Sequence, residues 1–277
     1  MSSIEPLEEL PQEKQEGTVK ILHIPLKITV KEGSFLHIGG SPSPLTKKKA
    51  VVFAVDRRPA VPASSFKGAF RYQLEQLFIT KKDQLKTELK INDDDLIKPC
   101  IPAPHPSKAE KELLNIGYRE HCYIVVEEDK VKVSQFGLCP VCYFFGATGI
   151  MGMLRIPNFW PLVGEYRIDQ TNIRIDRKSG TAATTAIVIG EQVKPGSIFR
   201  GTLEIIAKQG IFEFGKAREI GGTKVDMWLD GIASKPIGEA QLLLINKLLI
   251  PALNNITFLG GQKSKGAGKV TIEIDKT

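Results

Sequence analysis

The sequence predicts an α+β domain with a ferredoxin-like core. Stretches with strand-like patterns of apolar residues occur near both ends of the chain and twice in its second half. Two other stretches carry apolar residues at helical spacing. Along the chain these elements follow the order strand, helix, strands, helix, strand of a ferredoxin-like fold. The predicted strands are 18–30, 186–189, 197–207 and 270–274, and the predicted helices are 65–78 and 239–253.

The chain has 277 residues, of which 42% are hydrophobic and 25% charged, so one large domain with insertions is expected. Two segments interrupt the core order. Residues 80–146 are charged and rich in loops, with a helix predicted near 108–116 and a strand at 123–126. Residues 208–237 contain glycines and mixed charge. We therefore expect a single domain over 18–277 with two insertions.

The first seventeen residues are acidic, with five glutamates against one lysine and a net charge of −4. This polar segment, residues 1–17, is predicted to be a disordered tail. Because the whole chain carries +7, the remainder carries +11. Such a basic body favours a polyanionic partner, usually nucleic acid, although a lysine-rich surface that only serves solubility is an alternative.

The chain shows no sign of export or membrane insertion. Its start lacks a basic segment followed by an apolar core, so no signal peptide is expected. No apolar run approaches the ~18 residues of a membrane span. We expect a cytoplasmic protein.

A loop near the C-terminus, residues 259–269, holds four glycines, three lysines and no acid. Glycine allows backbone N–H groups to approach an anion closely, and lysine adds positive charge. The loop therefore predicts phosphate binding, with an ordinary hairpin turn as the alternative. Its spacing is not that of a nucleotide-binding P-loop, and no nucleotide cofactor is expected.

The start of the first predicted helix offers a second anion site. The helix follows Pro62, with Ser64 or Ser65 as its expected N-cap. Lys67 and Arg71 are four residues apart and share one helix face. A helix N-terminus with a free hydroxyl and two cations favours an anion.

Four cysteines lie in or beside the first insertion, and Cys139 and Cys142 have the spacing of half a tetrahedral zinc site. A loop-rich segment that cannot build its own core often needs a metal. The other half of the site must come from nearby cysteines or histidines. A buried pair of free thiols and a redox Cys-x-x-Cys motif are the alternatives. The preferred ligands are Cys100, Cys122, Cys139 and Cys142, with His105 or His121 as possible replacements.

Four motifs together resemble one family. They are Leu36-His-Ile-Gly-Gly40, Ser64-Ser-Phe-Lys-Gly-Ala-Phe-Arg71, Phe145-Gly146 and the terminal glycine loop. In this order they resemble the RAMP superfamily, and within it the backbone subunit of type III (Csm/Cmr-type) CRISPR effector complexes. The resemblance implies a modified RNA-recognition-motif fold, a structural zinc ahead of Phe145-Gly146, and a thumb hairpin over 167–186 that projects between guide and target RNA.

The resemblance also implies the partners and the contact residues. The partners are a CRISPR guide RNA, a complementary target RNA and other RAMP subunits packed side by side. No base preference is expected, because guide pairing supplies specificity. The candidate RNA-binding residues are His37, Gly39, Gly40, Lys48, Ser64, Ser65, Lys67, Arg71, Arg174, Arg177, Lys263, Ser264 and Lys265.

The sequence departs from active relatives at the catalytic position. These relatives carry an aspartate in the loop after the Gly-Gly pair, whereas residues 33–55 here contain no aspartate, and Lys47, Lys48 and Lys49 occupy the expected place. A charged lysine cannot accept a proton or position a metal as a carboxylate does. Asp56 is the nearest acid, and His37 is the other candidate acid or base.

We therefore expect an RNA-binding scaffold without its own catalytic residue. The alternative is an endoribonuclease that cuts target RNA through Asp56 or processes the guide precursor through His37. A zinc-containing protein-interaction module without an RNA role is a third class, which the charge distribution argues against.

Overall fold

The centre of the protein is an antiparallel sheet built on two long strands, β2 (Val19–Val30) and β13 (Ile198–Gln209). The computed structural model describes residues 3–40, 51–52, 54–55, 58–127, 130–162 and 166–276. Every second residue of β2 from Leu22 to Val30 is buried, because side chains alternate across a strand. The strands predicted over 18–30 and 197–207 are confirmed.

Short strands share the two outer edges of this pair. Along the outer edge of β2 lie β1 (Gln12–Glu16) and then β17 (Val270–Ile274). Three short strands line the outer edge of β13, each paired antiparallel to it. The order across the sheet is thus β17, β2, β13, β10. The three strands on β13 are β9 (Leu154–Arg155), β10 (Trp160–Pro161) and β14 (Phe212–Glu213).

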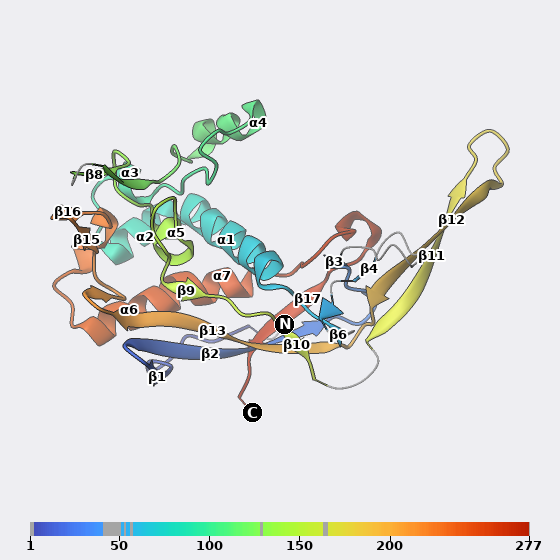
Figure 1. Ribbon diagram of the computed structural model, residues 1–277, viewed down its shortest axis with the longest axis horizontal. Coiled ribbons are helices and arrows are strands. Elements are labelled where there is room, and N and C mark those ends of the chain that lie inside the picture. Colours follow the sequence, from blue (N-terminus) through green and yellow to red (C-terminus); the bar gives the residue numbers. More distant parts are fainter. Residues whose placement is uncertain are drawn as a thin grey trace.

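Helices cover one face of the sheet (Figure 1). The longest, α1 (Ala63–Thr80), buries the predicted apolar face that begins at Phe66 and Phe70. The second predicted helix is divided into α6 (Ile237–Leu244), the π-helical turn η3 (Ile245–Leu249) and α7 (Ile250–Asn254). Pro251 has no N–H for a bond to the preceding turn, which explains the irregular hydrogen bonding there. None of the helices in the described part of the chain is long and apolar enough to cross a membrane.

The start of α1 differs from the prediction. Its N-cap is Pro62, and neither Ser64 nor Ser65 caps it, since both lie within the first turn. The Ala63 N–H instead donates to Oδ1 of Asn158, at 2.8 Å. A side chain from a distant loop thus replaces the expected serine cap, and the serine hydroxyls are not used for capping.

The insertions cluster above and beside the helices (Figure 1). The helix predicted near 108–116 is confirmed as two short turns, and the strand predicted at 123–126 is confirmed one residue later. The elements of the first insertion are α2 (Lys82–Leu89), α3 (Asp94–Ile97), α4 (Lys108–Lys111), η1 (Glu112–Ile116), β7 (Ile124–Glu127), β8 (Lys130–Val133) and α5 (Pro140–Phe145). The second insertion contains β15 (Glu219–Ile220), β16 (Thr223–Lys224) and η2 (Met227–Ile232).

A long hairpin projects away from the body of the molecule (Figure 1). It consists of β11 (Arg167–Ile175) and β12 (Ala182–Val193). Its turn is closed by Asp176, whose Oδ1 accepts bonds from the N–H groups of Lys178 and Ser179, both at 2.9 Å. The remaining short elements are β3 (Gly39–Gly40), β4 (Val51–Val52), β5 (Ala54–Val55), β6 (Arg58–Pro59) and η4 (Lys263–Lys265).

The N-terminal segment differs from the prediction of a disordered tail over 1–17. Residues 12–16 form β1, paired with β2, and Ile4 is buried. The prediction of disorder rested on the five glutamates of this segment. The apolar residues between those glutamates instead pack against the core, which holds the segment in place.

Candidate functional site

Three segments that are far apart in the sequence meet beside the base of the hairpin. The backbones of Leu36 and Val193 exchange two hydrogen bonds, of 3.1 and 2.8 Å. The N–H of Gly261 donates to the carbonyl of His37 at 2.8 Å, and the Gln192 side chain donates to Oε1 of Gln262 at 3.0 Å. The Leu-His-Ile-Gly-Gly motif, the glycine loop and the hairpin base therefore form one surface, which we call the junction.

The glycines of the loop allow close packing of backbone on backbone. A Cβ on Gly260 would lie 2.2 Å from the carbonyl oxygen of His37, and one on Gly268 would lie 2.4 Å from that of Leu259. The Gly268 N–H donates to the Phe35 carbonyl at 2.6 Å. Because Gly261 and Gly268 use their N–H groups inside the protein, these two groups are not available to an anion, contrary to our interpretation of the motif.

Two glycines of this loop, Gly260 and Gly266, allow the effect of a steric clash to be measured separately from the effect of a left-handed backbone. Gly260 and Gly266 both have positive φ angles, of +75° and +81°, but a Cβ on Gly266 would meet nothing within 4 Å. Gly266→Ala should therefore cost only the left-handed backbone strain of about 1–2 kcal/mol. Gly260→Ala adds a clash with the His37 backbone, so a larger loss of unfolding free energy is expected in urea denaturation. Equal losses would show that the junction shifts freely to accept the Cβ.

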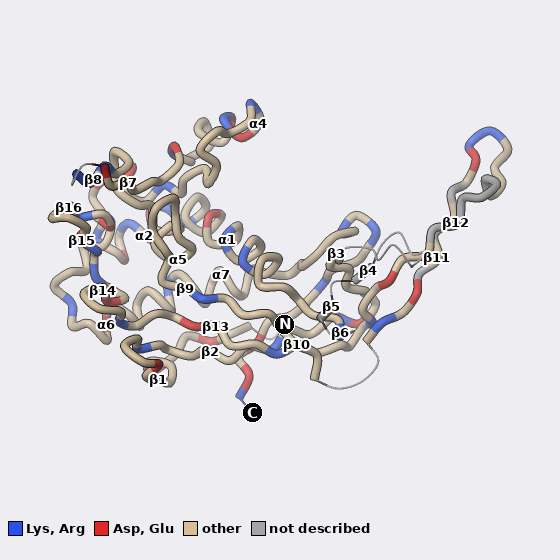
Figure 2. The backbone as a smooth tube through the Cα atoms, in the orientation of Figure 1, with Lys and Arg blue, Asp and Glu red and all other residues tan. Residues whose placement is uncertain are grey.

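The loop carries uncompensated positive charge at its tip. Lys263, Ser264 and Lys265 form η4 and are exposed. Among the residues that the structure describes, neither lysine has an acidic partner. Figure 2 shows these lysines, the basic residues near the start of α1 and those at the hairpin tip as separate groups along the molecule. The lysines of the loop therefore add positive charge to the junction, and its glycines allow the close backbone packing.

The other predicted contact residues are distributed over this part of the molecule. Gly39 is exposed and Gly40 pairs with Val51. Ser64 and Lys67 are exposed on the first turns of α1, and Ser65 is half-buried. Arg177 is exposed in the hairpin turn. The backbone of Arg174 lies in β11, whereas its side chain, Lys47, Lys48, Lys49 and Asp56 lie outside the described residues.

His37 is held in one orientation. Its Nδ1 lies 3.0 Å from the carbonyl oxygen of Glu191. Since a carbonyl only accepts hydrogen bonds, Nδ1 must carry the proton, and in the neutral ring Nε2 is left as an acceptor. The ring is half-buried. It can accept a hydrogen bond from a ligand hydroxyl, such as a ribose 2′-OH.

The four cysteines form a buried cluster. All their sulfur atoms lie within 4.8 Å of one another, and those of Cys100 and Cys142 are 3.3 Å apart. Zinc with four ~2.3 Å bonds to sulfur requires sulfurs about 3.8 Å apart, so the donor set and its spacing fit a tetrahedral site. A bound zinc ion would supply a cross-link with no open coordination position. His105 and His121, the alternative ligands, are not part of this group.

Two guanidinium groups lie against the cluster. Arg119 Nη2 donates to Cys122 Sγ at 3.3 Å, and Arg71 Nη2 donates to Cys142 Sγ at 3.6 Å. Four thiolates around a divalent ion carry a net charge of −2, which two arginines balance. Hydrogen bonds within the cluster, first from Cys100, hold the pKa of the Cys122 thiol well below its usual range, and Arg119 acts in the same direction.

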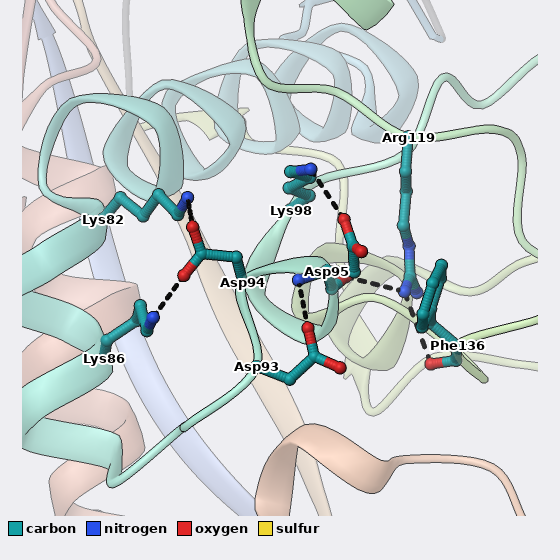
Figure 3. A network of polar contacts seen from close by, with 8 residues as sticks. All are labelled: Lys82, Lys86, Asp93, Asp94, Asp95, Lys98, Arg119 and Phe136. Carbon is teal, nitrogen blue, oxygen red and sulfur yellow. Dashed lines mark hydrogen bonds and ion pairs between the residues drawn. The ribbon is translucent and has the colours of Figure 1, made fainter.

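Arg119 also joins the chain segments that carry the cysteines (Figure 3). Its Nη1 donates to the carbonyls of Asp95, at 3.0 Å, and Phe136, at 3.3 Å. The Asp95 carboxylate is paired with Lys98 at 2.6 Å, and the neighbouring Asp94 accepts from both Lys82 and Lys86. The two Asp94 pairs link α3 to α2, on the segment that leads to Cys100, whereas the Asp95–Lys98 pair joins residues only three apart.

Arg71, one of the predicted RNA contacts, also has partners inside the protein. Its Nε donates to Oε1 of Glu75 at 2.9 Å, and its Nη2 donates to the sulfurs of Cys142, at 3.6 Å, and Cys100, at 3.9 Å. Burial raises the pKa of Glu75, while Arg71 opposes this effect. Arg71 and Lys67 line a cleft of about 460 Å³ between α1, the cysteines and the loop after Phe145. Arg71 therefore connects α1 to the cysteine cluster, and only part of it faces solvent.

Sequence reasoning missed the residues that position this site. Arg119 precedes Cys122 by three residues, and Glu75 follows Arg71 by four, so both pairs were visible as short spacings. Asn158 and Ser34 act over long range. Ser34 Oγ donates to the Gly266 carbonyl at 2.9 Å and accepts from the Lys269 N–H at 3.1 Å. No local pattern could have indicated such contacts.

Comparison with known proteins places the chain in a family. No curated protein matches it. The family model of the RAMP superfamily matches residues 29–271. The match begins at the end of β2, ends in β17, and includes the cysteine cluster, the hairpin and the glycine loop. The chain belongs to the RAMP superfamily.

Proposed function

We propose that the chain is a guide-RNA-binding backbone subunit of a type III CRISPR ribonucleoprotein in antiviral defence. It binds guide RNA and complementary target RNA in a cytoplasmic complex and packs beside other RAMP subunits. Family membership supports an RNA-binding role within a multi-subunit assembly. The basic body of the chain, with +11 outside the first seventeen residues, agrees with such a partner.

The observation that carries the proposal is the junction. It joins the Leu-His-Ile-Gly-Gly motif, the base of the projecting hairpin and a loop tip with two exposed lysines. Lysines at an exposed tip contact phosphates without reading bases, which suits a protein whose sequence specificity comes from guide pairing. His37 Nε2 adds an acceptor for a ribose hydroxyl at the same place.

The arrangement of the core supports a ferredoxin-like, modified RNA-recognition-motif fold. Four antiparallel strands lie in the order β17, β2, β13, β10, which corresponds to fourth, first, third and second along the chain. One helix follows the first strand and the other precedes the last, and both lie on the same face (Figure 1). This is the arrangement that the β-α-β-β-α-β order produces.

The hairpin is proposed to act as the thumb. It extends far from the body, and Arg177 lies exposed in its turn. Ile173 and Ile175 are 55% and 63% exposed in β11. Exposed isoleucines on a projecting hairpin suit insertion against an unstacked base. Arg174 is proposed to contact a phosphate beside it.

Removal of the two loop lysines tests RNA binding. Lys263→Ala with Lys265→Ala should weaken guide RNA binding and flatten its salt dependence. Each phosphate contact contributes about 0.7 to the slope of log K against log salt for single strands, so the slope should fall by about 1.4. The measurement is a titration of labelled guide RNA by fluorescence anisotropy at several salt concentrations.

The matched control removes the same charge elsewhere. Lys108 and Lys111 are exposed in α4, which projects from the first insertion and lies apart from the hairpin (Figure 1). Lys108→Ala with Lys111→Ala should leave the slope unchanged. If both double variants reduce the slope of log K against log salt equally, RNA binding depends on the net charge of the protein. The junction would then not be the binding surface.

A cleavage assay with the guide-loaded protein distinguishes a scaffold from a nuclease. We expect labelled target RNA to remain uncut by this subunit, with or without divalent metal. Cuts that disappear in Asp56→Ala, or cleavage of guide precursor that disappears in His37→Ala while guide binding is retained, would instead assign an endoribonuclease activity to the chain. His37 is one of the described residues, and its Nδ1 contact with the Glu191 carbonyl leaves Nε2 as an acceptor in the neutral ring.

A further inference from the structure

Gln262, in the glycine loop of the junction, has a strained backbone. Its φ is +58° and its ψ is 25°, and Lys90 is the only other non-glycine residue with a positive φ in the described part of the chain. This left-handed conformation brings Cβ too close to a carbonyl oxygen, whereas glycine adopts it freely. A glycine, of which the loop already holds four, would fit position 262 with less strain. The backbone alone therefore does not explain the glutamine.

The side-chain partner of Gln262 is a buried amide. Gln192, at the hairpin base, is 3% exposed, and its Nε2 donates to Gln262 Oε1 at 3.0 Å. Its own Oε1 is buried and has no hydrogen-bond partner among the residues that the structure describes. A buried amide with an unpaired oxygen is less favourable than an apolar side chain of the same size. Strain at Gln262 and incomplete pairing at Gln192 thus meet in one hydrogen bond, and such features are typical of functional sites.

The backbone of Gln262 connects this hydrogen bond to the lysines of the loop. Its carbonyl accepts from the N–H of Lys265 at 2.9 Å and from that of Ala267 at 3.4 Å. These two bonds close the turn that carries Lys263 and Lys265. Because the side chain of Gln262 is bound to β12 and its carbonyl shapes the turn, Gln192 fixes the position of the two lysines relative to the hairpin base.

The neighbours of Gln192 in β12 hold the other parts of the junction. The Glu191 carbonyl oxygen lies 3.0 Å from His37 Nδ1, and Val193 exchanges two backbone hydrogen bonds with Leu36. Three consecutive residues of one strand thus fix the histidine ring, the lysine turn and the start of the Leu-His-Ile-Gly-Gly motif. The phosphates and ribose hydroxyls of RNA are covalently linked, so a protein that uses both needs its lysines and His37 held in register.

We propose that Gln192 and Gln262 are positioning residues for RNA binding, whose hydrogen bond holds Lys263 and Lys265 in register with His37. This role rests on the proposed RNA-binding function of the junction. Gln192 acts through Gln262, because it is too buried to contact RNA itself. A turn that is already in place loses less conformational entropy when RNA binds, so the bond raises the affinity for RNA. The strain and the unpaired amide oxygen lower the free energy of unfolding in return.

A double variant of the full chain separates positioning from stability. Gln192→Met with Gln262→Asn removes the bond but keeps both lysines. The buried amide becomes an apolar side chain of similar size, and asparagine accepts a left-handed backbone more readily. The Tm should therefore equal or exceed that of the wild type in thermal unfolding.

RNA binding by this variant should change in the opposite direction. Its affinity for a fluorescein-labelled single-stranded RNA of mixed sequence should fall about fivefold in anisotropy titrations, the effect of one typical hydrogen bond. The slope of log K against log salt should stay unchanged, because both lysines can still reach phosphates. Gln192→Met alone should weaken binding as much as the double variant, since both changes break the same bond.

Lys90→Asn is the matched control. Lys90 is exposed at the end of α2, apart from the hairpin, and its φ is +53° (Figure 1). This variant relieves the same kind of strain and should leave the affinity for RNA unchanged. Equal RNA affinity in the wild type and the double variant would overturn the positioning role while RNA binding stands. A lower Tm that accompanies the loss of affinity would also overturn it, since the pair would then be structural. A wild type that does not bind RNA would refute the proposed function and this role together.

Discussion

Cys139→Ser is expected to abolish zinc binding and destabilise the protein strongly. The four sulfurs lie within 4.8 Å of one another and all four cysteines are buried, so one serine leaves three thiolates around an incomplete site. Structural zinc contributes about 10–16 kcal/mol in small zinc-finger peptides. Here the core is larger and the metal joins only part of it, so we expect a loss of about 4 kcal/mol, or about 10 °C in Tm.

The experiment is a measurement of zinc content by mass spectrometry together with thermal unfolding, with and without a chelator. Wild-type protein should lose stability on chelation, and more readily at acidic pH, because protons compete with the metal for thiolates. The variant should be insensitive to the chelator. His121→Ala serves as the control, since this histidine lies outside the cysteine group. A chelator-insensitive wild type, or zinc loss in His121→Ala, would contradict a four-cysteine zinc site.

Asp226→Ala is expected to produce the second large effect. The side chains of Arg218 and Asp226 are 2% and 0% exposed. Asp226 accepts from the Arg218 Nε at 2.7 Å and from its Nη2 and backbone N–H, each at 3.0 Å. Removal of one partner of a buried ion pair leaves an uncompensated charge and costs about 3–5 kcal/mol. The loss of unfolding free energy can be measured in urea.

The loss of the Arg218–Asp226 ion pair should also affect residues outside the second insertion. Arg218 Nη1 donates to the Met151 carbonyl at 2.9 Å, and its guanidinium lies 4.9 Å from the ring centre of Tyr143. The pair therefore fastens the second insertion to the helix that carries Cys142. Asp230→Ala is the matched control, since its pair with Lys224 is exposed and should contribute less than about 1 kcal/mol. Similar losses in the two variants would show that burial of the Asp226 pair adds nothing.

Local patterns predicted many of the elements. The strands over 18–30 and 270–274 follow from alternation, since one face of each packs on helices. The helix near 108–116 begins at Lys108, and its N-cap Ser107 forms a capping box with Glu110, which is a short-range signal. The spacing of Cys139 and Cys142 indicated half of a metal site, and the structure brings Cys100 and Cys122 to it.

The errors share a physical cause. Ser64 and Ser65 looked like caps, but Asn158, 95 residues from Ala63, supplies the acceptor. Residues 1–17 looked disordered, but Asn254 and Asn246 bind the backbone of Ile4 and Leu7 from 250 and 239 residues away. Arg71 stays a predicted phosphate contact, but its contact with Cys142, 71 residues away, could not be predicted from local spacing. In each case the partner is distant along the chain, so its position depends on the fold.

By itself the sequence determined the period of each element, the charge of the body, the glycines of the loop and the absence of an acid from residues 33–55. These properties depend on neighbours a few residues apart, which share one strand, helix or turn. Only the tertiary structure decided which groups meet. In the fold, the N–H groups of Gly261 and Gly268 bind the carbonyls of His37 and Phe35. Arg71 donates to a cysteine sulfur, and the three segments of the junction come into contact. Those outcomes follow from the packing of the sheet and helices, which local spacing does not contain.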